Sequence, residues 1–178
     1  APGAIPLVLH AQLTALMRRH QVTLVTPIGT DPGEAEAVAH LRTLGVEVHA
    51  LPLMDEGAGQ RWQRRGQLAG DWLIGRYPWR TAWFRSAALQ QVLDDLLAVS
   101  KFDIVQVEDN AMASYAYPTA TPTVLTEHEV RRARHVNWRR LVGREAFKHA
   151  FDELDWQRWA HYQKSAWAQF DRIVVFTQ

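Results

Sequence analysis

The most informative absence in this chain is cysteine, which occurs nowhere among its 178 residues. Disulfides, thiolate metal sites and cysteine nucleophiles are therefore excluded, and the composition fits a reducing compartment. Long apolar runs are also missing, so we expect no membrane-spanning helix, and the first residues do not resemble a signal peptide. Neither sign of charge dominates, since 20 basic residues face 19 acidic ones. The overall charge thus indicates neither nucleic acid nor an acidic partner.

Several familiar site motifs are absent as well. The sequence contains no Gly-x-Gly-x-x-Gly turn, no Walker phosphate loop, no Gly-x-Ser-x-Gly elbow and no His-Glu-x-x-His pair. The missing glycine turn disfavours a nucleotide-dependent oxidoreductase. In an extended strand Glu127, His128 and Glu129 would point alternately to opposite sides, which suits a metal poorly. We therefore expect no metal site.

What the chain does contain is a regular alternation of helical and strand patterns. Helices are predicted over 4–19, 34–44, around 89–97 and about 137–170, and strands over 22–26, 46–51, 102–108, 123–130 and 172–176. Strands separated by helices of this length indicate βαβ units. The predicted fold class is α/β, a Rossmann-like three-layer sandwich with a mostly parallel sheet. The length suits one domain.

Two of the predicted strands, 102–108 and 123–130, end in polar and ionisable residues. In open parallel sheets ligands bind outside the carboxyl ends of the strands, so these residues are predicted to form one functional rim. The rim residues are Glu108, Asp109, Asn110, Glu127, His128 and Glu129.

Four segments stand in an order that resembles a known family. Pro2-Gly3-Ala4-Ile5 enters a helix that ends at Arg18-Arg19-His20 before a strand, and the segments 102–108 and 123–130 follow. The last segment, Phe170-Asp171 followed by a strand and Thr177, closes the series. Together they resemble the amino-terminal domain of GT-B glycosyltransferases. The segment around His128 is most similar to the retaining group often called family four.

The resemblance implies that residues 1–178 form the amino-terminal, acceptor-side domain of an enzyme. The family's first strand precedes the glycine turn, and a carboxy-terminal domain grips most of the nucleotide-sugar donor; both are expected to lie outside this sequence. The implied activity is transfer of a sugar from a nucleotide-sugar to an acceptor hydroxyl, with retention and without metal, cofactor or nucleic acid. The isolated domain is expected to be inactive.

The resemblance also implies roles for individual residues. The family's matching histidine contacts the donor sugar near the reacting centre, so His128 is the predicted catalytic residue. Gly3 and Ala4 would form the ligand-facing turn, although the family often has a second glycine where Ala4 stands. The remaining rim residues are predicted donor or acceptor contacts. Among them, Glu129 stands where the family commonly has Asn or Asp.

Each of these residues also has a plain structural interpretation. His128 could be a buried strand-end histidine, the rim acids could cap helices, and Gly3 could be a simple turn glycine. The tryptophans could stack on sugars, although such residues more often pack helices together. The run 77–83 is a weaker candidate for lining the acceptor side. The tryptophans concerned are Trp62, Trp72, Trp79 and Trp83.

A local basic run follows the second rim segment. Apolar residues are interleaved with it, which allows an interfacial patch on anionic lipid as well as an ordinary solvated face. A lipid-linked acceptor would need such contact, whereas a soluble or small-molecule acceptor would not. The expected location is cytoplasmic, with peripheral contact at the inner membrane face. The patch residues are Arg131, Arg132, Arg134, Arg139 and Arg140.

A rival interpretation remains open at this point. In it the chain is a non-catalytic Rossmann-like binding or interaction module, and His128 with the rim acids only stabilises the fold. The two hypotheses differ in whether the rim contributes to sugar transfer.

Overall fold

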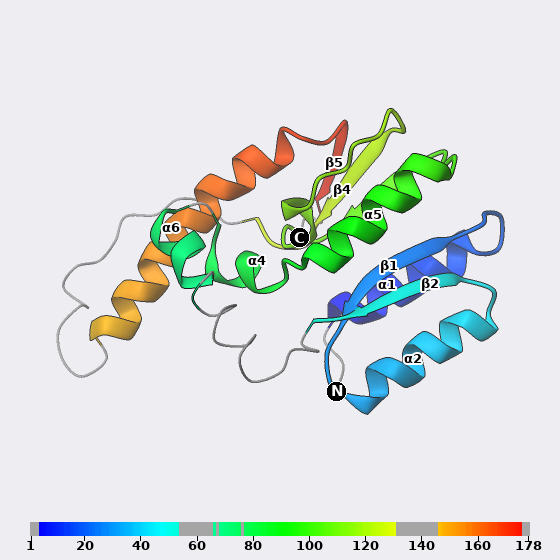
Figure 1. Ribbon diagram of the computed structural model, residues 1–178, viewed down its shortest axis with the longest axis horizontal. Coiled ribbons are helices and arrows are strands. Elements are labelled where there is room, and N and C mark those ends of the chain that lie inside the picture. The colour runs from blue at the N-terminus through cyan, green and yellow to red at the C-terminus, as the bar shows by residue number, and fades with distance from the viewer. Residues whose placement is uncertain (1–3, 54–65, 67, 76, 131–145, 176–178) are drawn as a thin grey trace. The chain divides into compact units, whose positions relative to one another are not determined.

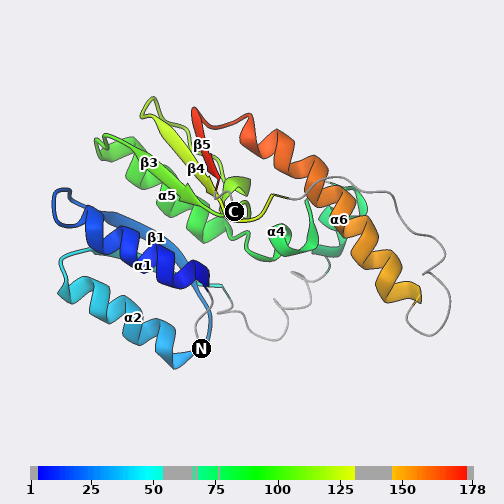
Figure 2. The same cartoon turned by 180° about the vertical axis from the view of Figure 1, so that it is seen from behind.

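The computed structural model describes residues 4–53, 66, 68–75, 77–130 and 146–175. The chain divides into two compact units, which are described separately. The first comprises Ala1–Asp55 and Ser86–Val99, and the second comprises Glu56–Arg85 and Ser100–Gln178. Figures 1 and 2 together label the α-helices and strands of both.

The first unit is a two-stranded parallel sheet with helices packed on it. β1 (Thr23–Ile28) pairs with β2 (Glu47–Pro52), and Thr23 lies opposite Glu47. α2 (Pro32–Thr43) joins the two strands, because neighbouring parallel strands need a crossover connection. α2 contacts β2, and α5 (Ala87–Val99) contacts both strands. α1 (Ala4–Leu16) precedes β1, and Figures 1 and 2 show it beside the strands.

The local sequence explains where α2 begins and ends. The carboxylate of Asp31 accepts a hydrogen bond from the backbone N–H of Gly33 at 2.9 Å, which caps the first turn. Gly45 follows the helix with φ of +91°, a conformation that glycine adopts without a steric penalty. Between these ends, Val38 packs with Val46 and Val48 to form the unit's small core.

The second unit is a three-stranded parallel sheet in the order β3-β4-β5. Its elements are α4 (Trp79–Trp83), β3 (Val105–Glu108), the 3-10 helix η1 (Met112–Ser114), β4 (Thr123–Glu127), α6 (Ala146–Trp167) and β5 (Arg172–Val175). Both strand pairs are parallel, and Glu108 lies opposite Thr126. The carboxyl ends of β3 and β4 therefore meet at the same edge of the sheet.

Alternation along the strands builds the core of the second unit. Val107 and Leu125 lie opposite each other in the register, and both are buried. They pack with Ala113 of η1 and with Tyr162 and Ala166 of α6. One face of the sheet is thus covered by α6, as the apolar positions of β3 and β4 require.

The amino ends of β4 and β5 are joined by a pair of polar side chains. The Asp171 carboxylate accepts hydrogen bonds from the Thr123 backbone N–H at 2.8 Å and from its hydroxyl at 2.9 Å. The Asp171 N–H in turn donates to the Thr123 hydroxyl oxygen at 3.2 Å. The backbone hydrogen bond from Thr123 is the largest cause that lowers the pKa of Asp171. The Phe170-Asp171 segment therefore fixes where β5 enters the sheet.

The structure confirms the α/β fold class with parallel strands, in keeping with a Rossmann-like fold. The strands form two sheets, one in each unit. The predicted strand 102–108 begins only at Val105, and the chain after β3 forms the single 3-10 turn η1. The first part of the helix predicted from residue 137 lies outside the described residues. The described part of that helix, α6, extends to Trp167.

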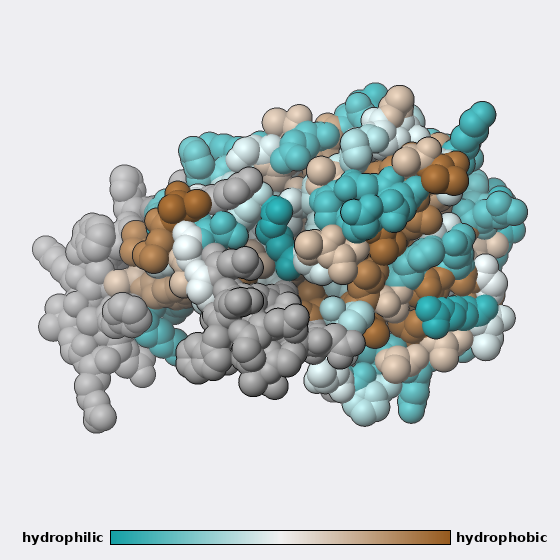
Figure 3. Space-filling model, viewed as in Figure 1, coloured by the Kyte–Doolittle hydropathy of each residue, from teal (hydrophilic) through white to brown (hydrophobic). Residues whose placement is uncertain are grey.

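Apolar residues are not confined to the two cores. Figure 3 shows hydrophobic residues scattered among polar ones on the face in view. In β5, Ile173, Val174 and Val175 are all substantially exposed. Among the described residues, no helix combines the length and the apolar character needed to cross a bilayer.

Leu125 offers a direct test of the second unit's core. Its side chain is fully buried, so Leu125→Ala should lower the free energy of unfolding by about 2–5 kcal/mol. Ile104 is 55 % exposed and precedes β3, so Ile104→Ala should change the free energy of unfolding by less than about 0.5 kcal/mol. Urea denaturation followed by circular dichroism measures both. Equal losses in the two variants would contradict this description of the core.

Candidate functional site

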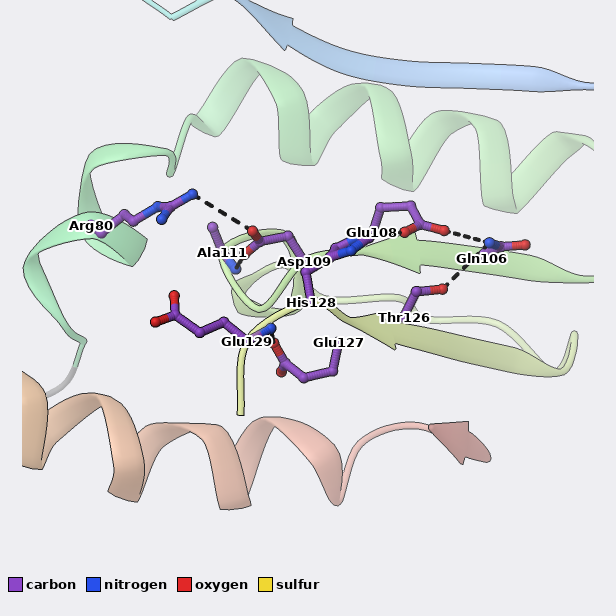
Figure 4. Close-up of polar contacts among 9 residues, drawn as sticks. All are labelled: Arg80, Gln106, Glu108, Asp109, Ala111, Thr126, Glu127, His128 and Glu129. Atoms are coloured by element: carbon purple, nitrogen blue, oxygen red, sulfur yellow. Dashed lines mark hydrogen bonds and ion pairs between the residues drawn. The ribbon is translucent and has the colours of Figure 1, made fainter. Parts of the chain in front are cut away.

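The candidate site lies where β3 and β4 end side by side. Because the strands are parallel and Glu108 is opposite Thr126, the residues that follow both strands emerge at one edge of the sheet. Figure 4 shows this edge, with Glu108 and Asp109 from β3 and its loop, and Glu127, His128 and Glu129 from the end of β4. The predicted rim is therefore assembled from two neighbouring strands.

The central contact of the site joins Glu108 and His128. Nε2 of His128 lies 2.9 Å from Oε2 of Glu108, and the histidine side chain is only 4 % exposed. A carboxylate only accepts hydrogen bonds, so this contact favours the state in which Nε2 carries the proton. The contact fixes the plane of the imidazole ring against β3.

Gln106 supports the carboxylate from the other side. Its Nε2 donates a hydrogen bond to Oε1 of Glu108 and lies 3.4 Å from the Thr126 hydroxyl oxygen. Gln106 and Glu108 are two residues apart, so they lie on the same face of β3. A row of three polar side chains, Gln106, Glu108 and His128, thus runs across the two strands.

Asp109 turns the chain away from β3 in an unusual backbone conformation. Its φ is +74°, and among the described residues other than glycine it alone has a positive φ. Its backbone N–H donates to the Thr126 carbonyl at 3.0 Å, and its side chain accepts from the Ala111 N–H at 2.9 Å. Arg80 of α4 reaches the other carboxylate oxygen at 3.7 Å. The side chain therefore caps the turn before η1, as the structural interpretation proposed.

Glu127 points to the opposite face from His128. The residue is 2 % exposed, and its carboxyl group accepts hydrogen bonds from the indole N–H of Trp167 at 3.1 Å and the backbone N–H of Glu129 at 3.3 Å. Burial raises the pKa of Glu127, although the hydrogen bonds from Trp167, Gln163 and Glu129 oppose that rise. This carboxyl group faces α6 and the protein interior.

Asn110 is also buried, although it follows the rim directly. Its backbone carbonyl accepts a hydrogen bond from the Tyr162 hydroxyl at 3.0 Å. Its side-chain amide, and likewise the buried Thr81 hydroxyl, has no hydrogen-bond partner within the described part of the chain. Glu129 is exposed, in contrast to Asn110 and Glu127.

The structure brings together part of the predicted set. Glu108 and His128 form a pair, Asp109 adjoins them, and Glu127 and Asn110 lie beneath the surface. The roles of all five residues as ligand contacts stay predictions. Ala4 is the first residue of α1. Gly3 and the five predicted patch arginines, Arg131, Arg132, Arg134, Arg139 and Arg140, lie outside the described residues.

Three residues at or behind the rim were missed by sequence reasoning. Gln106 had a detectable signal, because it precedes Glu108 by two positions and shares its face. Gln163 and Trp167 come from a distant helix, and no local spacing links them to the rim. Arg80 falls in the run 77–83, which was a weaker candidate for the acceptor side. Gln163 and Trp167 are four residues apart on α6, so a single helix face presents both.

The described tryptophans of the 72–83 region mostly pack helices. The ring of Trp72 stacks on Phe151 of α6 with centroids 4.6 Å apart, and Trp79 meets the same ring edge-on at 5.9 Å. Asp155 accepts hydrogen bonds from the Trp72 indole N–H and from the Trp79 backbone. The guanidinium of Arg158 lies over Trp72 at 4.0 Å. These contacts agree with the packing interpretation for Trp72 and Trp79, whereas Trp62 lies outside the described residues.

No protein-family model, curated protein or solved structure matches this chain. Within the described ranges, no group of three or more histidine, aspartate or glutamate side chains is arranged to hold a metal ion. The likeness to GT-B glycosyltransferases stays a prediction.

Asp109 provides a test of the turn that shapes the rim. Asp109→Asn should stay close to the wild type, because asparagine tolerates a positive φ and keeps an oxygen for the Ala111 N–H. Asp109→Ala keeps the strained backbone and loses the acceptor, so it should cost about 1–2 kcal/mol of unfolding free energy. Asp109→Gly, which relieves the strain, should fall between them. Chemical denaturation ranks the three, and an alanine variant as stable as the wild type would refute the capping role.

Proposed function

We propose that this chain is the amino-terminal domain of a GT-B glycosyltransferase and that His128 contacts the donor sugar. The observation that carries the proposal is the Glu108–His128 pair at the carboxyl ends of two adjacent parallel strands. Ligand sites in parallel α/β sheets lie at such ends. The order of the segments along the sequence agrees with the same family.

The pair suits the chemistry of sugar transfer. An oxocarbenium-like transition state needs hydrogen-bonding groups held in place around the sugar, because any reorientation during the reaction adds to the barrier. The contact of Nε2 with Glu108 holds the ring in one orientation, so the ring would not have to turn during the reaction. Glu108 in this proposal orients His128, which is a more specific role than general contact with the acceptor.

Groups other than His128 would bind the donor diphosphate and the acceptor hydroxyl. The donor diphosphate would be bound by a carboxy-terminal domain, and the nucleotide-sugar is a substrate, so the proposal involves no resident cofactor. Glu129, which is exposed beside His128, is the rim residue best placed to meet an acceptor hydroxyl. The proposed outcome is transfer to a sugar, lipid-linked or small-molecule acceptor with retention of configuration, in the cytoplasm.

His128→Ala tests the central assignment. In the full-length protein, with a panel of nucleotide-sugar donors, this variant should lower kcat/KM for transfer by roughly 100-fold, because one fixed hydrogen-bonding group near the sugar is lost. His161→Ala is the matched control, since His161 lies exposed on α6 and should leave turnover unchanged. Unchanged turnover in His128→Ala would refute the role of His128, whereas a wild type that transfers sugar from none of the donors would favour the non-catalytic binding module.

Membrane contact through the basic run can be tested separately. Vesicles containing anionic lipid should bind the protein at low salt, and the binding should weaken as salt rises because the attraction is screened. Replacing Arg131, Arg132 and Arg134 with glutamine should reduce this binding, and neutral vesicles serve as the control. Sedimentation that shows no binding to anionic vesicles at low salt would remove the lipid-contact hypothesis.

A further inference from the structure

Two buried side chains hold the backbone that follows His128. The Glu127 carboxyl group accepts the N–H of Glu129 at 3.3 Å, and Gln163 of α6 donates to the carbonyl of Glu129 at 2.7 Å. Both Glu127 and Gln163 are almost completely buried. The peptide groups before and after Glu129 are therefore each bound by a side chain from the interior.

The same carboxyl group also ties this backbone to α6. Its other oxygen accepts from the Trp167 indole N–H at 3.1 Å, and Gln163 provides a further hydrogen bond to the carboxyl group. Figure 4 shows the Glu127 side chain bending under the backbone of Glu129, with the ribbon of α6 below it. A single carboxyl group thus links the end of β4, the next peptide and one face of α6.

An acid at this position is energetically costly. Burial raises the pKa of Glu127, and the nearby Asp109 raises it further, whereas the donors around the carboxyl group lower it. The indole N–H of Trp167, the backbone N–H of Glu129 and the side-chain amide of Gln163 all donate, so each needs an acceptor oxygen. A carboxyl group supplies two such oxygens, whereas a glutamine at 127 would supply only one.

We propose that Glu127 is a positioning residue: with Gln163 it fixes the peptide groups beside Glu129 and thereby sets the direction of the His128 ring. The ring is then held from two sides, by Glu108 at Nε2 and by the backbone that Glu127 and Gln163 bind. The consequence for sugar transfer rests on the proposed function. The positioning of the ring by Glu127 and Gln163 does not depend on the proposed function.

The test compares Glu127→Gln with a control substitution just beyond the end of α6. Glutamine keeps the shape of the side chain and loses one acceptor, whereas Gln169→Leu changes an exposed residue two positions after Trp167. The full chain is labelled with ¹⁵N-histidine, and the His128 signals are assigned from their loss in His128→Ala. Ring ¹⁵N shifts are recorded through a pH titration, together with the free energy of unfolding.

Glu127→Gln should shift the His128 ring resonances, and those of the exposed His161 should not respond. Gln163→Met removes the hydrogen bond to the Glu129 carbonyl and should shift the same resonances. It replaces Glu127→Gln in the test if that variant does not fold. Gln169→Leu should leave them in place. If both interior variants lower stability yet leave the His128 resonances unchanged, the positioning role is wrong and the contacts only stabilise the fold.

The enzymatic consequence is measured in the full-length protein. Glu127→Gln should lower kcat for sugar transfer about tenfold with little change in KM, since the ring would be misdirected and substrate binding kept. A shifted ring with unchanged kcat would overturn the catalytic consequence. If the wild type transfers no sugar from any donor, the proposed function fails, and the resonance shifts still decide the positioning role.

Discussion

The parallel pairing of β3 with β4 is the constraint on which the site depends. Its register places Val107 opposite Leu125 on the face covered by α6, and it places Glu108 opposite Thr126 on the other face. Because side chains alternate along a strand, a slip of one residue would bring the polar row into the core. Burial of the apolar residues therefore fixes the register, and the register in turn brings the Glu108 carboxylate to His128.

The same alternation gives Glu127 and His128 different surroundings although they are neighbours. Glu127 shares the face of Leu125, so it meets Trp167 and Gln163 and is buried. His128 lies on the face of Glu108 and Gln106, where a row of polar side chains holds its ring. The Glu127 side chain thus contacts α6 in the interior, whereas the next side chain, His128, contacts Glu108 at the rim. The adjacency of an acid and a histidine in the sequence does not make them a catalytic pair, since the partner of His128 is on the next strand.

The sequence was sufficient to predict the parallel α/β class and the strand ends that carry Glu108 and His128, because periodicity and the position of polar residues after a strand are local properties. It could not predict which rim acids face inward or which helix meets them. Trp167 lies 40 residues after Glu127, and their contact depends on how α6 packs. The positive φ of Asp109 was equally hidden, since aspartate is common in ordinary turns as well. These features come from tertiary packing, which no local spacing records.

The connection from β4 through α6 to β5 gives the rim its support. At its amino end β4 is bound to the start of β5, where Asp171 accepts two hydrogen bonds from Thr123. At its carboxyl end it is bound to the last turns of α6, through Glu127 and Trp167. α6 leads directly into β5, so both attachments of β4 belong to one continuous stretch of chain. A movement of the His128 backbone relative to Glu108 would have to break the attachment at Glu127 or carry α6 with it. The direction of the histidine ring is therefore coupled to the packing of α6 through the attachment at Glu127.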